Sequence, residues 1–196
     1  MSTTLNVELA PDHLQQLASS HPSGALEELI WNAIDADATQ IDIEVDRNDL
    51  QGIEEIRVRD NGHGLHFEGV QNSFGKLGGS TKPETFRSAR GRLLHGQHGC
   101  GRYKAFSLGR LVTWESTYED DGGDERFFQL KGDLRNPGSF VLSELEDNRG
   151  EGTGVVVRIS GIDKQLPSLL NGQAQSALCL KFSPELLVYE DLAIIY

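Results

Sequence analysis

The stretch from residue 24 to residue 39, GALEELIWNAIDADAT, is the part of this chain that decides its fold. Its polar residues Glu28, Asn32 and Asp35 are spaced at i, i+4 and i+7, so on a helix they share one face. Apolar residues occupy much of the remaining surface: Leu26, Leu29, Ile30, Ala33 and Ile34. The stretch predicts a core helix with a polar stripe. That stripe faces either a cavity or water, and the helix alone does not distinguish the two.

Length and composition predict one soluble domain. The chain has 196 residues, of which 37% are hydrophobic, 24% are charged and 22 are glycine. It contains no apolar run of membrane-spanning length, and its first residues lack the pattern of a secretory signal, so we expect a cytoplasmic protein. The strand-like end, Leu192 to Tyr196, indicates an N-terminal fragment of a longer protein. Cys100 and Cys179 do not form a Cys-x-x-Cys pair, which disfavours a disulfide framework or structural zinc.

The charge distribution points to one anion-binding region. The net charge of -12 argues against nucleic-acid binding by this domain itself. The segment from Lys82 to Lys104, however, contains six basic residues and a single acid, Glu84. This is the region suited to a polyanion.

The pattern of apolar residues predicts a mostly antiparallel sheet. Residues 41–46 and 56–59 alternate apolar and polar side chains around a short turn, which predicts a hairpin. Further strands are expected at residues 111–117, 126–131 and 139–145. Residues 154–159 contain three contiguous valines and are therefore expected at the centre of the sheet.

Four short motifs follow one another along the chain. They are Glu28-x-x-x-Asn32, Asp60-x-Gly62-x-Gly64, Gly96-x-x-Gly99-x-Gly101 and Gly152-Thr153. Each is weak alone, because glycine triplets occur by chance. In this order, with a strand before Asp60 and a helix-like segment after Gly101, the chain resembles the GHKL ATPase superfamily over about residues 24 to 160. That superfamily includes the ninety-kilodalton heat-shock chaperones, MutL and MORC proteins, type II topoisomerase subunits and histidine kinases.

The resemblance implies a fold class and a domain organisation. We expect residues 1–196 to form a single α/β (α+β) two-layer sandwich, the Bergerat ATP-binding fold, with a mixed, mostly antiparallel sheet and helices on one face. A lid is expected from about residue 66 to residue 101. The motifs around Asn32 resemble MutL and MORC sequences, whereas the Gly96 loop is nearer to the chaperone and MORC pattern, so the subfamily stays open.

The Asp60 motif is expected to bind adenine. A carboxylate can accept a hydrogen bond from the exocyclic amine of adenine, and Gly62 and Gly64 would let the backbone approach the base. Thr153 resembles the family threonine that supports this aspartate from a neighbouring strand. Without the other motifs, Asp-Asn-Gly would be a solvated turn.

The glycine loop is expected to bind the phosphates through backbone N–H groups. It is not a P-loop, because Lys-Ser or Lys-Thr does not follow the glycines. The resemblance assigns nucleotide contacts here and in a loosely aligned lid segment to Ser80, Thr81, Lys82, Gly96, Gln97, His98, Gly99, Cys100, Gly101 and Arg102.

The helix is expected to supply the reaction chemistry. Asn32 resembles the family's Mg²⁺ ligand, and Glu28 is placed to activate the water that attacks the γ-phosphate of ATP. Asp35, with Asp37, is expected to support the site. A zinc site built from His63, His66, His95 and His98 is disfavoured, since no acid or cysteine completes the spacing.

The resemblance implies Mg²⁺-dependent ATP hydrolysis coupled to lid closure and ATP-dependent homodimerisation, which would control downstream domains of the same chain. The family's hydrolases also need a basic residue from the following domain, so we expect weak hydrolysis by this domain alone. The alternatives are a kinase core of the histidine or serine type, and a nucleotide-sensing dimerisation module without significant hydrolysis.

Overall fold

A computed structural model of the chain describes residues 3–6, 21–75, 87–95, 101–147, 150, 152–163 and 165–196. The strands are β1 (Thr3–Asn6), β2 (Gln40–Arg47), β3 (Ile53–Asp60), β4 (Leu111–Glu119), β5 (Glu125–Asp133), β6 (Ser139–Leu142), β7 (Glu146–Asp147), β8 (Gly154–Ser160) and β9 (Ala193–Ile195). The helices are α2 (Pro22–Asp35), α3 (Phe67–Gly75), α4 (Gly101–Lys104), the 3-10 turn η1 (Ala105–Ser107), α5 (Pro167–Leu170) and α6 (Gln173–Val188).

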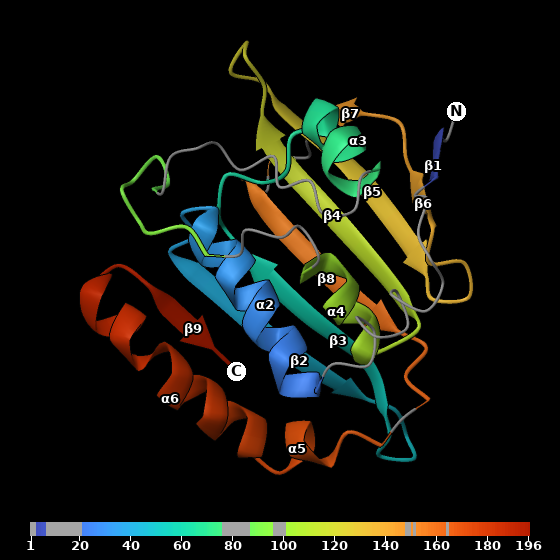
Figure 1. Cartoon of the computed structure of the whole chain (residues 1–196), viewed down its shortest axis with the longest axis vertical. Helices are drawn as coiled ribbons and strands as arrows, with labels where there is room; N and C mark the ends of the chain where they lie inside the picture. The colour runs from blue at the N-terminus through green and yellow to red at the C-terminus, as the bar shows by residue number, and fades with distance from the viewer. Residues whose placement is uncertain are drawn as a thin grey trace.

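The described strands form one open sheet with helices on one face, as Figure 1 shows. The order is β1-β6-β5-β4-β8-β3-β2-β9, with β7 paired to β5 beside this path. Neighbouring strands in it are antiparallel, apart from the parallel pair β2–β9. The predicted α/β architecture with a mixed, mostly antiparallel sheet is confirmed.

The predicted hairpin and the predicted central strand are both present. In β2 and β3, Ile43 lies opposite Val58 and Ile41 lies opposite Asp60. The side chain of Asn48 closes the turn by accepting hydrogen bonds from the N–H groups of Leu50 and Gly52. Strand β8 pairs with β3 on one side and with β4 on the other. This pairing brings the end of β3 beside the start of β8.

Helix α2 begins at Pro22 and packs its apolar face on the sheet. Its buried apolar residues are Ala25, Leu26, Leu29, Ile30, Ala33 and Ile34. The helix ends at Asp35, four residues before the end of the quoted stretch, because Asp37 adopts φ 60°, outside the right-handed helical region. The chain therefore turns sharply at residues 36–38 before it enters β2.

An aromatic cluster fixes α4 and η1 to the sheet. Tyr103 and Phe106 are almost fully buried and lie against Phe140, with ring centroids 5.9 and 6.5 Å away. Gly132 in β5 leaves the necessary space, since a Cβ there would lie 2.8 Å from atoms of both Phe106 and Phe140. The position of α4 relative to the sheet is set by this packing.

The structure differs from the sequence expectations at three strands. The strand expected over 139–145 ends at Leu142, and Glu146–Asp147 pair separately with β5. Strand β1 pairs with β6 and was not anticipated. No helix within the described ranges is both long and apolar enough to cross a membrane.

Candidate functional site

The polar stripe of α2 meets three different environments. Glu28 is half-buried, and its Oε2 lies 2.8 Å from Nζ of Lys104. Asn32, one turn later, is exposed. The buried carboxylate of Asp35 accepts from the backbone N–H of His95 with both oxygens, at 2.8 and 3.1 Å. One helix face thus carries an ion-paired acid, an open amide and an acid that holds a neighbouring segment.

Asp60 ends β3 with its carboxylate held by backbone N–H groups. Gly62 N–H donates to Oδ1 at 2.8 Å, and Val155 N–H also donates to this carboxylate. The residue keeps some accessible surface, whereas burial of its carboxyl group raises the pKa to about 6, against the opposing effect of these hydrogen bonds and of His63. Asp60 is therefore a carboxyl group poised to accept a hydrogen bond in a poorly solvated position.

The glycines of this motif stand where a side chain would not fit. A Cβ on Gly62 would lie 2.6 Å from the carbonyl oxygen of Ala36, at the end of α2. Gly64 adopts φ 74°, and a Cβ there would lie 2.1 Å from the carbonyl oxygen of Thr117. Asn61 ties the loop to the start of β2 by accepting from Thr39 N–H and Gln40 N–H, both at 2.8 Å.

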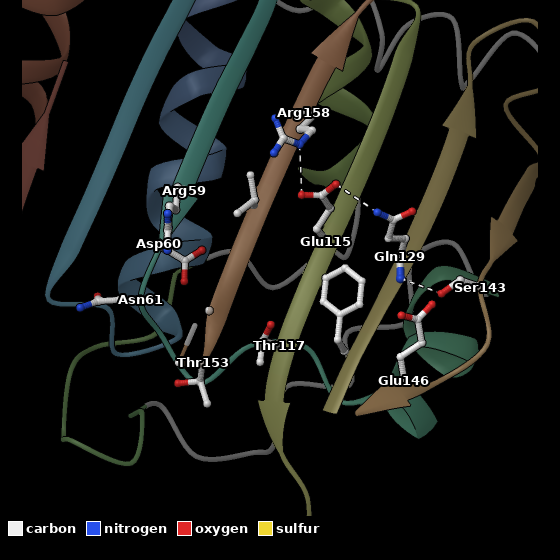
Figure 2. A pocket seen from close by; sticks show the side chains of 14 residues that line it. Arg59, Asp60, Asn61, Glu115, Thr117, Gln129, Ser143, Glu146, Thr153 and Arg158 are labelled. Carbon is white, nitrogen blue, oxygen red and sulfur yellow. Dashed lines mark hydrogen bonds and ion pairs between the residues drawn. The ribbon is translucent and has the colours of Figure 1, made fainter. Parts of the chain in front are cut away.

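The Gly152-Thr153 motif enters β8 beside Asp60. Gly154 adopts φ 147°, and a Cβ on it would lie 2.1 Å from the backbone carbonyl oxygen of Asp60. Thr153 lines a hollow that Asp60 also borders (Figure 2). The close approach of the two strands places Val155 N–H on the Asp60 carboxylate.

The two ends of the candidate site lie along helix α2. The Asp60 loop meets the helix at Ala36, where His63 N–H donates to the Ala36 carbonyl at 2.9 Å. Glu28 lies eight residues earlier, which is about 12 Å along a helix. One end of the site is therefore formed by Asp60, and the other by Glu28 with Gly101 and Lys104.

The glycine loop is described only at its end. Gly101 touches Glu28, since a Cβ there would lie 1.9 Å from Glu28 Oε1. Arg102 belongs to α4. The other expected nucleotide contacts lie outside the described residues: Ser80, Thr81, Lys82, Gly96, Gln97, His98, Gly99 and Cys100.

The segment 87–95, within the expected lid, is anchored to the end of α2. The carboxylate of Asp37 accepts from Ser88 Oγ at 2.5 Å and from Arg90 N–H at 3.1 Å. His95 stacks on Trp31, with ring centroids 3.7 Å apart. Together with the Asp35 hydrogen bonds, these contacts fix the segment against the helix.

Arg92 fastens the same segment to the C-terminal part of the chain. It is buried, and its guanidinium donates to the Ala38 carbonyl at 2.5 Å and to Asp191 at 3.1 Å. The guanidinium also lies 4.9 Å from the ring centroid of Tyr189. Segment 87–95, the end of α2 and residues 189–191 thus form one packed unit.

The histidines have contacts of their own. His63 Nδ1 lies 2.8 Å from the Gly64 carbonyl oxygen, and the His66 ring lies 4.8 Å from the Tyr118 ring. No group of three metal-ligating residues of the His, Cys, Asp and Glu types occurs in the described part of the chain.

A polar hollow of about 480 Å³ lies on the sheet face opposite the helices (Figure 2). Three of its polar side chains form a chain of contacts: Arg158 lies 3.1 Å from Glu115, and Gln129 donates to Glu115 at 3.1 Å. Arg158 also lies 3.0 Å from Glu55, outside the lining. Such mutual pairing is what a solvated sheet face requires. Apart from Asp60 and Thr153 at its rim, the hollow therefore adds no residue to the candidate site.

The family model described as "Histidine kinase-, DNA gyrase B-, and HSP90-like ATPase" matches residues 19–151. The chain belongs to this family. The predicted GHKL membership is therefore confirmed, and this GHKL domain is an ATP-binding domain of the ATPase type.

Similar proteins carry the printed name "DNA mismatch repair protein MutL". The protein of Neisseria meningitidis serogroup C (strain 053442) is 34% identical over 132 residues, which is 65% of this chain and 19% of that protein. The protein of Exiguobacterium sp. (strain ATCC BAA-1283 / AT1b) is 49% identical over 55 residues, 27% of this chain and 8% of that protein. The aligned part of this GHKL chain spans about a fifth, or less, of the length of these relatives.

Sequence reasoning missed the contacts of two basic residues, Lys104 at the site and Arg92 in the packed unit at the end of α2. Lys104 was counted only as part of the basic region, although it pairs with Glu28. Arg92 was counted in the same way, although it is buried. The local excess of basic residues was a signal for both, but their acidic partners lie 76 and 99 residues away in the sequence.

Proposed function

We propose that this GHKL domain binds Mg²⁺-ATP along α2 and hydrolyses it to ADP and phosphate. The observation that supports this most strongly is the pair of carboxylates at the two ends of the site. Asp60 is desolvated and held by backbone donors, whereas Glu28 is half-buried beside a lysine and a glycine. The amine of an adenine at Asp60, and the water that attacks the γ-phosphate at Glu28, would give each carboxylate a hydrogen-bond donor.

Adenine recognition is assigned to Asp60, with Gly62, Gly64 and Thr153 around it. The carboxylate already accepts two backbone N–H groups and retains acceptor capacity for the exocyclic amine of adenine. A guanine would present a carbonyl oxygen at that position, which a carboxylate does not bind. The site would therefore select adenine over guanine.

The phosphate end is assigned to Glu28, Asn32 and the glycine loop. The exposed amide of Asn32 offers the hard oxygen ligand that Mg²⁺ accepts alongside phosphate oxygens. Bound there, Mg²⁺ would offset the charge of the phosphates. Glu28, one turn away, would orient a water molecule and take its proton as that water attacks the γ-phosphate. Asp35 would act indirectly, by holding His95.

The proposal extends to a conformational cycle. ATP binding would close the lid, approximately residues 66–101, and promote homodimerisation. Through this dimerisation the domain would control attached domains. The much greater length of the similar MutL proteins supports this part of the proposal. Hydrolysis by the domain alone would be weak.

Phosphate release tests the hydrolase assignment. Wild type and Glu28→Ala are compared under single-turnover conditions with Mg²⁺-ATP and protein in excess. Both should bind ATP, and removal of the general base should slow phosphate release about a hundredfold or more. Equal release by the two proteins would contradict the proposal. If ATP labelled at the γ-phosphate transfers its label to protein, the domain is a kinase rather than a hydrolase.

A further inference from the structure

Lys104 is a cation at the catalytic end of the site, and the roles assigned so far do not use it. Its Nζ lies 2.8 Å from Glu28 Oε2, with the lysine side chain 37% exposed and the glutamate side chain 19% exposed. The other carboxylate oxygen, Oε1, lies against Gly101. Glu28 is thus held between the ammonium group and the last residue of the glycine loop.

The backbone at Lys104 is fixed, whereas its side chain reaches towards solvent. The neighbouring residues Tyr103, Ala105 and Phe106 are all buried in the core. The four-carbon stem of a lysine carries its charge on rotatable bonds. The ammonium group can therefore change partner without moving α4.

A purely structural role explains the ion pair poorly. A partly exposed ion pair contributes about 1 kcal/mol or less to stability, and the aromatic cluster already holds α4 against the sheet. The pair does have an electrostatic consequence at the site. An incoming triphosphate would repel the Glu28 carboxylate unless a cation lay between them.

We propose that Lys104 binds the terminal phosphate of ATP and so lets this domain itself distinguish ATP from ADP. Before nucleotide binds, the ammonium group pairs with Glu28. When ATP binds, the ammonium group of Lys104 moves to the γ-phosphate. Glu28 is then free to hold the attacking water. This inference rests on the proposed ATP site. It places a basic residue for the γ-phosphate within this domain, in addition to the one that the family's hydrolases are expected to take from the following domain.

Nucleotide affinities test the inference without relying on hydrolysis. Titrations with Mg²⁺ and either ADP or a non-hydrolysable ATP analogue are made on wild type, Lys104→Met and Lys104→Arg. We expect Lys104→Met to weaken binding of the ATP analogue about tenfold or more, because it loses a charge-assisted hydrogen bond, and to change ADP affinity less than about twofold. Lys104→Arg should recover part of the ATP affinity, since it keeps the charge.

Lys181→Met is the matched control. This substitution removes another lysine that approaches an acid of α2. Lys181 lies on α6, and its Nζ is 4.0 Å from Glu27 Oε2. Both of its nucleotide affinities should equal those of wild type. If Lys104→Met changes ATP and ADP affinity equally, or changes neither, Lys104 is only a tether and the inference is overturned while the ATP site stands. If wild type binds neither nucleotide, the inference and the proposed function fail together.

Discussion

The carboxyl group of Asp60 combines a structural cost with a functional use. Burial raises its pKa to about 6, above the ordinary 3.8, so the folded chain resists ionisation of the group that is proposed to read adenine. Donors from Gly62 and Val155 lower this cost without removing it. An ionised Asp60 therefore lowers the free energy of unfolding, at a position proposed to bind a ligand. Perturbed pKa values of this kind are common at functional sites.

This raised pKa predicts a pH dependence of stability. The folded state holds the Asp60 proton more tightly than the unfolded state, so the contribution to the free energy of unfolding is complete below pH 3.8 and is lost as the pH rises through about 6. The difference in pKa corresponds to about 3 kcal/mol at most. Asp60→Asn does not titrate. The unfolding free energy of Asp60→Asn minus that of wild type should therefore increase between pH 4 and pH 7.

Urea unfolding of the two proteins across this pH range measures the difference directly. Other titrating groups are common to both proteins, so their effects cancel to first order. A difference that stays constant from pH 4 to pH 7 would show that the Asp60 carboxyl group is not desolvated in the folded chain.

Helix α2 shows what a local pattern can and cannot predict. Its apolar face and its polar stripe follow from helical spacing, and both are found. The use of Asp35 and Asp37 could only be expected in general terms, because their partners His95 and Ser88 lie 60 and 51 residues further along the chain. Lys104 illustrates the same limit, since the sequence showed its charge but not its contact with Glu28.

The end of α2 predicts a specific effect on segment 87–95. Asp37 adopts φ 60°, a conformation that asparagine tolerates better than alanine, and an amide oxygen can replace one carboxylate acceptor. Asp37→Ala should therefore raise amide hydrogen exchange in residues 88–92 about tenfold, while Asp37→Asn should raise it much less. Hydrogen exchange followed by mass spectrometry measures both.

Trypsin cleavage at Arg87 and Arg90 should show the same order of the two variants. Peptides from β4 and β8 serve as internal references, because these strands pair with each other at the centre of the sheet. Equal protection of segment 88–92 in the two variants would mean that the Asp37 hydrogen bonds do not hold it.

The whole sheet could be predicted in its centre better than at its edges. Alternating side chains identified β2 and β3. Strands β4 and β5 were also expected, and three contiguous valines identified β8 as central. The outer pairings, β1 with β6 and β9 with β2, involve short strands far apart in the sequence, and nothing local specifies them. The candidate site depends on the central strands and α2, where the motifs around Glu28, Asp60 and Thr153 lie, and its assignment stays a prediction.

The proposed nucleotide crosses that centre, from Asp60 at the end of β3 to Glu28 and Lys104 between α2 and α4. The most direct test of this placement is a calorimetric titration of the protein with Mg²⁺ and a non-hydrolysable ATP analogue, with the guanine analogue as a comparison. We predict that one ATP analogue binds per chain, that the guanine analogue binds much more weakly, and that Asp60→Asn loses affinity for the adenine nucleotide by about tenfold or more while remaining folded. Unchanged affinity in folded Asp60→Asn, or equal affinity of the wild type for the two bases, would contradict it.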